Sequence, residues 1–204
     1  MPWHATGGLT VDRTRELCRA LAGLSLISLN AEHGGRISLH DVIRDHLRRT
    51  LGATGISRVN GHLIDAVAAS LPPAQPLGPA ASDPGYAWWQ ADHGHLLDHL
   101  ISHLLDTDRA TDAEAVAGDL RRVETRLAQR GPSAPSSDLA RIDTPRSRSL
   151  ARSLAQAAHL LTPTQPEHSL TAILHSRLDA HPHWHHQVST RQGDPALRPG
   201  LTNL

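Results

Sequence analysis

The stretch from Leu26 to Leu47 changes its hydrophobic period once, and that change constrains the fold more than any other feature of the sequence. Before residue 40 the apolar residues form two short runs, separated by residues 30–35, which tolerate positive φ and include Gly34 and Gly35. This pattern predicts a β-hairpin. After Leu39 the apolar residues recur at helical spacing, which predicts an amphipathic helix that starts directly after the hairpin, with Val42, Ile43, Leu47 and Leu51 on one face.

Helical patterns lie on both sides of this stretch. One helix is expected over residues 11–24 and another over 58–71, with a break at residues 52–55. A hairpin wing beside helices outlines a winged helix, although only one helix precedes the wing here. We therefore expect residues 1–71 to form a partial winged-helix domain of two helices plus the hairpin.

A change of composition divides the chain after residue 71. Residues 72–85 contain five prolines among small residues, which is typical of an extended linker. Helical periodicity then resumes without an alternating strand pattern, so residues 86–180 should form an all-helical domain of antiparallel helix pairs. Residues 181–204 are polar and interrupted by Pro and Gly, and we expect a flexible tail or connector. The fold class is thus mainly α.

Local signals predict several boundaries in the helical domain. Thr111 and Glu114 have the spacing of a capping box at a helix start. Gly118 favours a break into two short helices, because glycine costs about 1 kcal/mol in a helix interior. Residues 132–137 should form a loop, and Thr144-Pro145 has the preferred proline just inside a helix start.

Composition excludes several classes of function. Among 204 residues the 20 basic side chains are all arginines, so the chain has neither the lysine of a phosphate-binding P-loop nor a catalytic lysine. The formal net charge is zero, so no bulk attraction to nucleic acid or anionic lipid is expected. The single cysteine, Cys18, rules out an internal disulfide and suits a reducing compartment. Because neither a membrane span nor a secretory signal is evident, we expect a cytoplasmic protein without membrane partners.

The candidate site lies where the wing meets the helix. His40 and Asp41 place an imidazole and a carboxylate at this corner. The imidazole could donate an N–H to an anion, and the carboxylate could orient the ring or cap the helix. From spacing alone, a simple helix cap with a polar neighbour is the favoured interpretation of the pair.

Three segments resemble the winged-helix part of NB-ARC proteins, which belong to the STAND class of signalling ATPases: residues 24–29, the turn at 34–36, and residues 39–47. In that family a Met-His-Asp motif occupies this corner, and its histidine contacts the β-phosphate of bound ADP. His40 and Asp41 match the last two motif positions, and Leu39 replaces the methionine. The resemblance implies that His40 and Asp41 bind the nucleotide in an intact parent protein.

The same resemblance extends beyond the linker. Residues 94–104, 119–127 and 150–161 are similar to the helical domain that follows in such proteins, and residues 195–201 to the connector into a WD-repeat propeller. It implies that the chain is a fragment whose partners are the nucleotide-binding domain and the propeller of a parent, which oligomerises when active. The isolated chain would then be no enzyme and would hold no cofactor, since ADP or ATP belongs to the parent.

Two alternative functions remain possible interpretations of the sequence. A winged-helix DNA-binding regulator would use Arg13, Arg15 and Arg19 on phosphates and Arg36 in the minor groove, but nucleic acid is disfavoured by the acidic residues on the same elements. A metal-dependent enzyme would use the histidine stripe His95, His99 and His103 or the cluster at residues 181–186. We expect the stripe to be structural, the cluster to chelate metals adventitiously, and no metal site.

Overall fold

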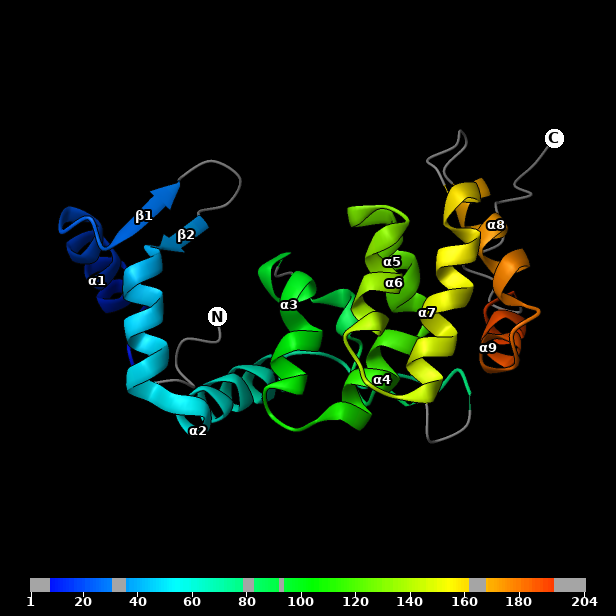
Figure 1. The fold of residues 1–204 in the computed structure, drawn as a ribbon, viewed down its shortest axis with the longest axis horizontal. Coiled ribbons are helices and arrows are strands. Elements are labelled where there is room, and N and C mark those ends of the chain that lie inside the picture. Colours follow the sequence, from blue (N-terminus) through cyan, green and yellow to red (C-terminus); the bar gives the residue numbers. More distant parts are fainter. Residues whose placement is uncertain (1–7, 31–35, 79–82, 92–93, 162–167, 193–204) are drawn as a thin grey trace. The chain divides into compact units, whose positions relative to one another are not determined.

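A computed structural model describes residues 8–30, 36–78, 83–91, 94–161 and 168–192. The described chain is mainly helical and contains a two-stranded antiparallel sheet (Figure 1). The expectation of a mainly α fold is therefore confirmed. The chain divides into two compact units, residues 1–67 and 68–204.

The first unit contains the predicted hairpin. Its elements are α1 (Val11–Gly23), β1 (Ile27–Asn30), β2 (Arg36–Leu39) and α2 (Asp41–Ala68), the last of which ends one residue beyond the unit. The strands pair with Ile27 opposite Leu39 and Leu29 opposite Ile37, so these four apolar residues share one face of the hairpin. The turn between the strands, residues 31–35, lies outside the described residues.

Helix α2 bends at Gly52. This residue has φ 62° and ψ 178°, a backbone conformation outside the helical region that glycine adopts without steric cost. The structure thus confirms the predicted break at this glycine. The helix resumes immediately, because Gly55 is already helical, and it ends at Ala68 rather than at residue 71.

The expected linker is partly folded within the second unit. An isolated antiparallel bridge joins Pro73 to Tyr86, and the Ala74 N–H donates to the Gly85 carbonyl over 3.0 Å. The two ends of the segment are therefore hydrogen-bonded to each other, which corrects the expectation of a simple extended linker. Residues 79–82 lie outside the described residues.

The second unit is a stack of short helices (Figure 1). They are η4 (Trp88–Gln90), α3 (Gly94–Leu105), α4 (Ala110–Gly118), α5 (Leu120–Arg130), α6 (Ser133–Ala140), α7 (Pro145–Ala157), η5 (Ala158–Leu160), α8 (His168–Leu178) and α9 (Pro182–Gln192). Helices adjacent in sequence pack on each other. Their shared core is built largely of leucines that are almost completely buried, among them Leu100, Leu104, Leu120, Leu139, Leu150, Leu154, Leu174 and Leu178.

Several helix boundaries follow the local signals. The break at Gly118 is confirmed, since α4 ends there and Asp119 caps α5 by accepting a hydrogen bond from the Arg121 N–H over 3.0 Å. Thr144 caps α7 in the same way, accepting from the Ser147 N–H over 3.0 Å, and Pro145 is the first residue of that helix. Both caps satisfy a backbone donor that a helix start leaves unpaired.

Two local predictions were wrong. The segment expected as a loop at 132–137 belongs largely to helix α6. The capping box at Thr111 does not form, because α4 begins after Arg109, whose side chain makes no capping hydrogen bond. The Glu114 carboxylate instead accepts from the Ser147 hydroxyl at 2.9 Å and from the Thr144 hydroxyl, 33 and 30 residues away.

The expected flexible tail also needs correction, because its first part is helix α9. Trp184 and Val188 are completely buried, and their spacing of four residues places them on one face of the helix. The polar composition of the segment concealed this two-residue anchor. Residues 193–204, which include the proposed connector, lie outside the described residues.

Candidate functional site

The corner between β2 and α2 exposes both predicted site residues. His40 lies between the last strand residue, Leu39, and the first helical residue, Asp41, and the side chains of His40 and Asp41 are both exposed. The His40 N–H donates to the Leu26 carbonyl over 3.3 Å, and its carbonyl accepts from the Arg44 N–H over 2.9 Å. These backbone bonds fix the corner and leave the imidazole on the surface.

Asp41 lies in the first turn of α2, where a carboxylate interacts favourably with the helix dipole. Its carboxylate pairs with the Arg44 guanidinium at 3.0 Å, one turn along the helix. The pair is largely exposed, so its contribution to stability is small. Asp41 therefore has a local structural role, and His40 is the residue of the two with a ring available to an incoming anion.

The elements that meet at this corner carry exposed apolar side chains. Among the described residues with large exposed apolar side chains, all but Tyr86 belong to the first unit, and the set includes Leu29, Ile37 and Leu39 on the hairpin and Val42, Leu47 and Leu51 on α2. Ile27 is the single large apolar side chain buried between residues 8 and 59 of the described chain. Exposed apolar side chains in this number are a feature of interaction sites in soluble proteins.

Helix α1 presents the arginines of the DNA-binding alternative. Arg13, Arg15 and Arg19 are exposed, and Arg15 pairs with Asp12 at 3.3 Å. Acidic side chains are interleaved with the basic ones, so α1 is not a uniformly basic surface.

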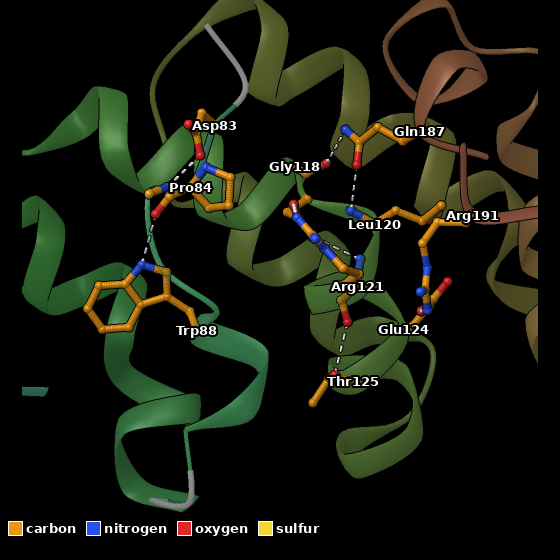
Figure 2. Close-up of polar contacts among 12 residues, drawn as sticks. Asp83, Pro84, Trp88, Gly118, Leu120, Arg121, Glu124, Thr125, Gln187 and Arg191 are labelled. Carbon is orange, nitrogen blue, oxygen red and sulfur yellow. Dashed lines mark hydrogen bonds and ion pairs between the residues drawn. The ribbon is translucent and has the colours of Figure 1, made fainter. Parts of the chain in front are cut away.

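A second polar site, which the sequence did not indicate, joins α9 to the junction of α4 and α5. The Gln187 side chain lies between Gly118 and Leu120 (Figure 2). Its carbonyl oxygen accepts from the Leu120 N–H over 2.8 Å, and its amide nitrogen donates to the Gly118 carbonyl over 3.1 Å. The Trp184 indole N–H donates to the same carbonyl over 2.9 Å. Side chains of α9 thus satisfy the backbone groups left unpaired where α4 ends and α5 begins.

Glu124 extends this attachment to α8. Its carboxylate lies 2.6 Å from the His175 ring nitrogen Nε2. It also lies 2.8 Å from the Arg191 guanidinium of α9 (Figure 2). Burial raises the pKa of Glu124, but the hydrogen bonds from His175 and Arg191 outweigh burial, so the net pKa is lowered. Glu124 therefore stays ionised and holds both partners at neutral pH.

The two tryptophans at the entry to the second unit pack as anchors. Trp88 is buried and donates its indole N–H to the Pro84 carbonyl over 3.1 Å (Figure 2). The guanidinium carbon of Arg121 lies 3.8 Å from the centre of the Trp89 ring, which is a cation–π contact.

The histidine stripe on α3 brings three rings near one another. The ring centres of His95 and His99 are 4.5 Å apart, and His103 follows at 6.4 Å from His99. Within the described ranges, however, no group of three or more His, Cys, Asp or Glu side chains is arranged to hold a metal ion.

The histidines of residues 181–186 lie in or next to α9 and do not point the same way. His183 is half-buried beside Gly118, whereas His185 and His186 are exposed.

Among the helices of the described residues, none is both long and apolar enough to cross a membrane. Comparisons with protein-family models, with curated proteins and with solved structures find no match to this chain.

Proposed function

We propose that this chain is a non-catalytic regulatory module of a STAND-type NB-ARC signalling ATPase, in which His40 contacts the β-phosphate of ADP. The observation that carries the proposal is the exposed His40 ring at the corner between β2 and the N-terminus of α2. A helix N-terminus favours an anion through its dipole and its unpaired N–H groups, and the imidazole adds a further donor.

The exposed apolar side chains of the first unit support a partner at this corner. Leu29 and Ile37 are each 45% exposed, and Val42, two residues after His40, is 70% exposed. A nucleotide-binding domain that closes on this unit would remove such surface from water and gain about 25 cal/mol for each Å² of apolar area. The nucleotide and the apolar contact would then stabilise the same closed state.

In this mechanism His40 biases a two-state equilibrium. ADP would be held jointly by the nucleotide-binding domain and His40 only when the module is closed, so its affinity for the closed state would exceed that for the open state. The helices of the second unit would link this closure to a WD-repeat propeller. Exchange of ADP would open the parent and permit its oligomerisation.

The test is His40→Ala in the parent protein, with the exposed His46→Ala of α2 as the matched control. Loss of one hydrogen bond to a charged phosphate costs about 1.5–3 kcal/mol, so ADP should dissociate about tenfold to a hundredfold faster and basal signalling should rise. His46→Ala should change neither. Unchanged ADP retention and unchanged signalling in the His40 variant would refute the proposal.

The DNA-binding alternative is tested separately by gel shift on a nonspecific duplex at low salt. It draws on the exposed Arg13 and Arg19 of α1. Binding that weakens steeply with salt and is lost on replacement of both arginines by glutamine would favour it over the signalling module.

A further inference from the structure

The ring of His183 has a group that can only donate, the Arg146 guanidinium, against its Nδ1 atom. Its Nδ1 atom is 2.6 Å from a terminal nitrogen of the Arg146 guanidinium on α7, and its Nε2 atom is 3.0 Å from the Gly118 carbonyl oxygen. Because a guanidinium only donates, Nδ1 must be unprotonated, so the neutral ring carries its proton on Nε2. Nε2 can donate this proton to the Gly118 carbonyl and also lies 3.2 Å from the Gln187 amide nitrogen. These contacts therefore select one neutral tautomer of the ring.

His181, which immediately precedes α9, has the same requirement. Its Nδ1 atom accepts the backbone N–H of His183 over 3.3 Å, and its Nε2 atom lies 3.3 Å from the Ser149 hydroxyl of α7. A protonated Nδ1 could not accept the first of these bonds. Both histidines thus attach α9 in their neutral forms.

We propose that His181 and His183 form an acid-sensitive clasp, which holds α9 on the junction of α4 and α5 at neutral pH and releases it when the rings are protonated. An extra proton on His183 would direct an N–H at the Arg146 guanidinium and set two cations 2.6 Å apart. An extra proton on His181 would remove its hydrogen bond to the start of α9.

The surrounding charges favour the neutral rings. Burial lowers the pKa of His183, Arg146 and His181 lower it further, and the Gly118 carbonyl and Glu114 act in the opposite direction without reversing the shift. Burial and Arg146 also lower the pKa of His181. The Glu114 carboxylate lies 3.5 Å from Arg146, and its negative charge partly offsets the effect of that cation on His183.

Other charged contacts of α9 persist through the same pH range. The Arg191–Glu124 pair remains ionised, because the pKa of Glu124 is lowered. His185 lies 3.0 Å from the Asp179 carboxylate, but both side chains are at least 49% exposed, so this contact is weak. The clasp histidines therefore set the direction of the response.

The sign of the pH dependence follows from these shifts. Each histidine binds a proton more readily when α9 is detached, where its pKa is near 6.5, than when α9 is attached. Attachment is complete above pH 6.5 and weakens as the pH falls through the lowered values. For each histidine the opening constant of α9 can rise by up to about tenfold per pH unit.

The test is hydrogen exchange of the intact chain followed by mass spectrometry at pH 7.5 and 5.5, corrected for intrinsic rates. Wild-type amides of residues 183–192 should lose protection at pH 5.5 relative to α4–α7, by up to about tenfold for each histidine. His183→Gln keeps a neutral donor near the Nε2 position and should remove the part of this response that belongs to His183, leaving that of His181. The exposed His186→Gln on the same helix should respond as wild type.

A response equal in His183→Gln and wild type, or no wild-type response, would overturn the clasp. Proton NMR titration of the wild-type ring signals gives an independent measure if His183→Gln fails to fold. The clasp requires His183 to titrate below the ordinary histidine pKa of 6.5, and a higher value for His183 would refute it.

Discussion

Asp138 compensates the most deeply buried cation of the second unit, and its removal is the sharpest test of how that unit is held together. Arg122 is 1% exposed, and its guanidinium donates to the Asp138 carboxylate over 3.1 Å and to the Leu97 carbonyl over 2.9 Å. Arg126, also buried, donates to the same oxygen of Asp138 over 3.0 Å. One carboxylate therefore serves two buried guanidinium groups.

The magnitude follows from what Asp138→Ala would leave behind. Burial lowers the pKa of Arg122 to about 10, so the side chain stays charged at neutral pH. An uncompensated buried charge of this kind costs about 3–5 kcal/mol. At a denaturant dependence of about 2 kcal/mol per molar urea, the unfolding midpoint should fall by about 2 M.

The assay is urea unfolding of the whole chain at pH 7, followed by the helical circular dichroism signal. Asp143→Ala is the matched control, because Asp143 also pairs with an arginine, Arg148, but is 96% exposed, and its midpoint should not move. The double variant Arg122→Met/Asp138→Ala should recover part of the loss, since it removes the uncompensated Arg122 charge, while Arg126 keeps its pair with Asp98 at 2.8 Å. An Asp138→Ala midpoint within about 0.3 M of wild type, which is under 1 kcal/mol at that slope, would refute the compensation.

Two further predictions concern helix attachment. Gln187→Ala should lower the free energy of unfolding by about 1–3 kcal/mol and reduce hydrogen-exchange protection in α9, because it leaves the Leu120 N–H unpaired. The control Gln192→Ala, at an exposed position, should change neither quantity. Equal protection in the two variants would contradict this prediction. Thr144→Ala should lower the thermal unfolding midpoint, because the cap of α7 contributes about 1 kcal/mol to stability. Thr144→Ser, which keeps a capping hydroxyl, should retain most of this stability. A midpoint equal to wild type for Thr144→Ala would show that the cap contributes nothing.

The features that the sequence predicted correctly depend on neighbouring residues. The break at Gly52 requires only a residue that tolerates positive φ, and the start of α7 requires only Thr144 followed by proline. The hairpin follows from two apolar runs around a turn. In each case the physical cause lies within a few residues, so periodicity and turn chemistry were sufficient.

The features that were missed depend on residues far apart in the chain. Gln187 is 67 residues from Leu120, and no local pattern relates an amide in a polar segment to a helix start elsewhere. Glu114 had the spacing of a capping residue, but the distant Thr144 and Ser147 hydroxyls compete successfully for its carboxylate. The buried pair Trp184 and Val188 was the available signal for α9, and the surrounding histidines obscured it.

The same apolar periodicity has different outcomes in the two units, and this difference bears on function. In the second unit the periodic leucines, such as Leu100 and Leu150, are buried by helices of the same unit. In the first unit the pattern correctly located the hairpin and α2, yet Leu29, Ile37 and Val42 remain largely exposed. An apolar face usually persists in a sequence because something covers it. The exposed face beside His40 therefore supports a closing partner, and the ADP-retention experiment tests whether that partner brings a diphosphate.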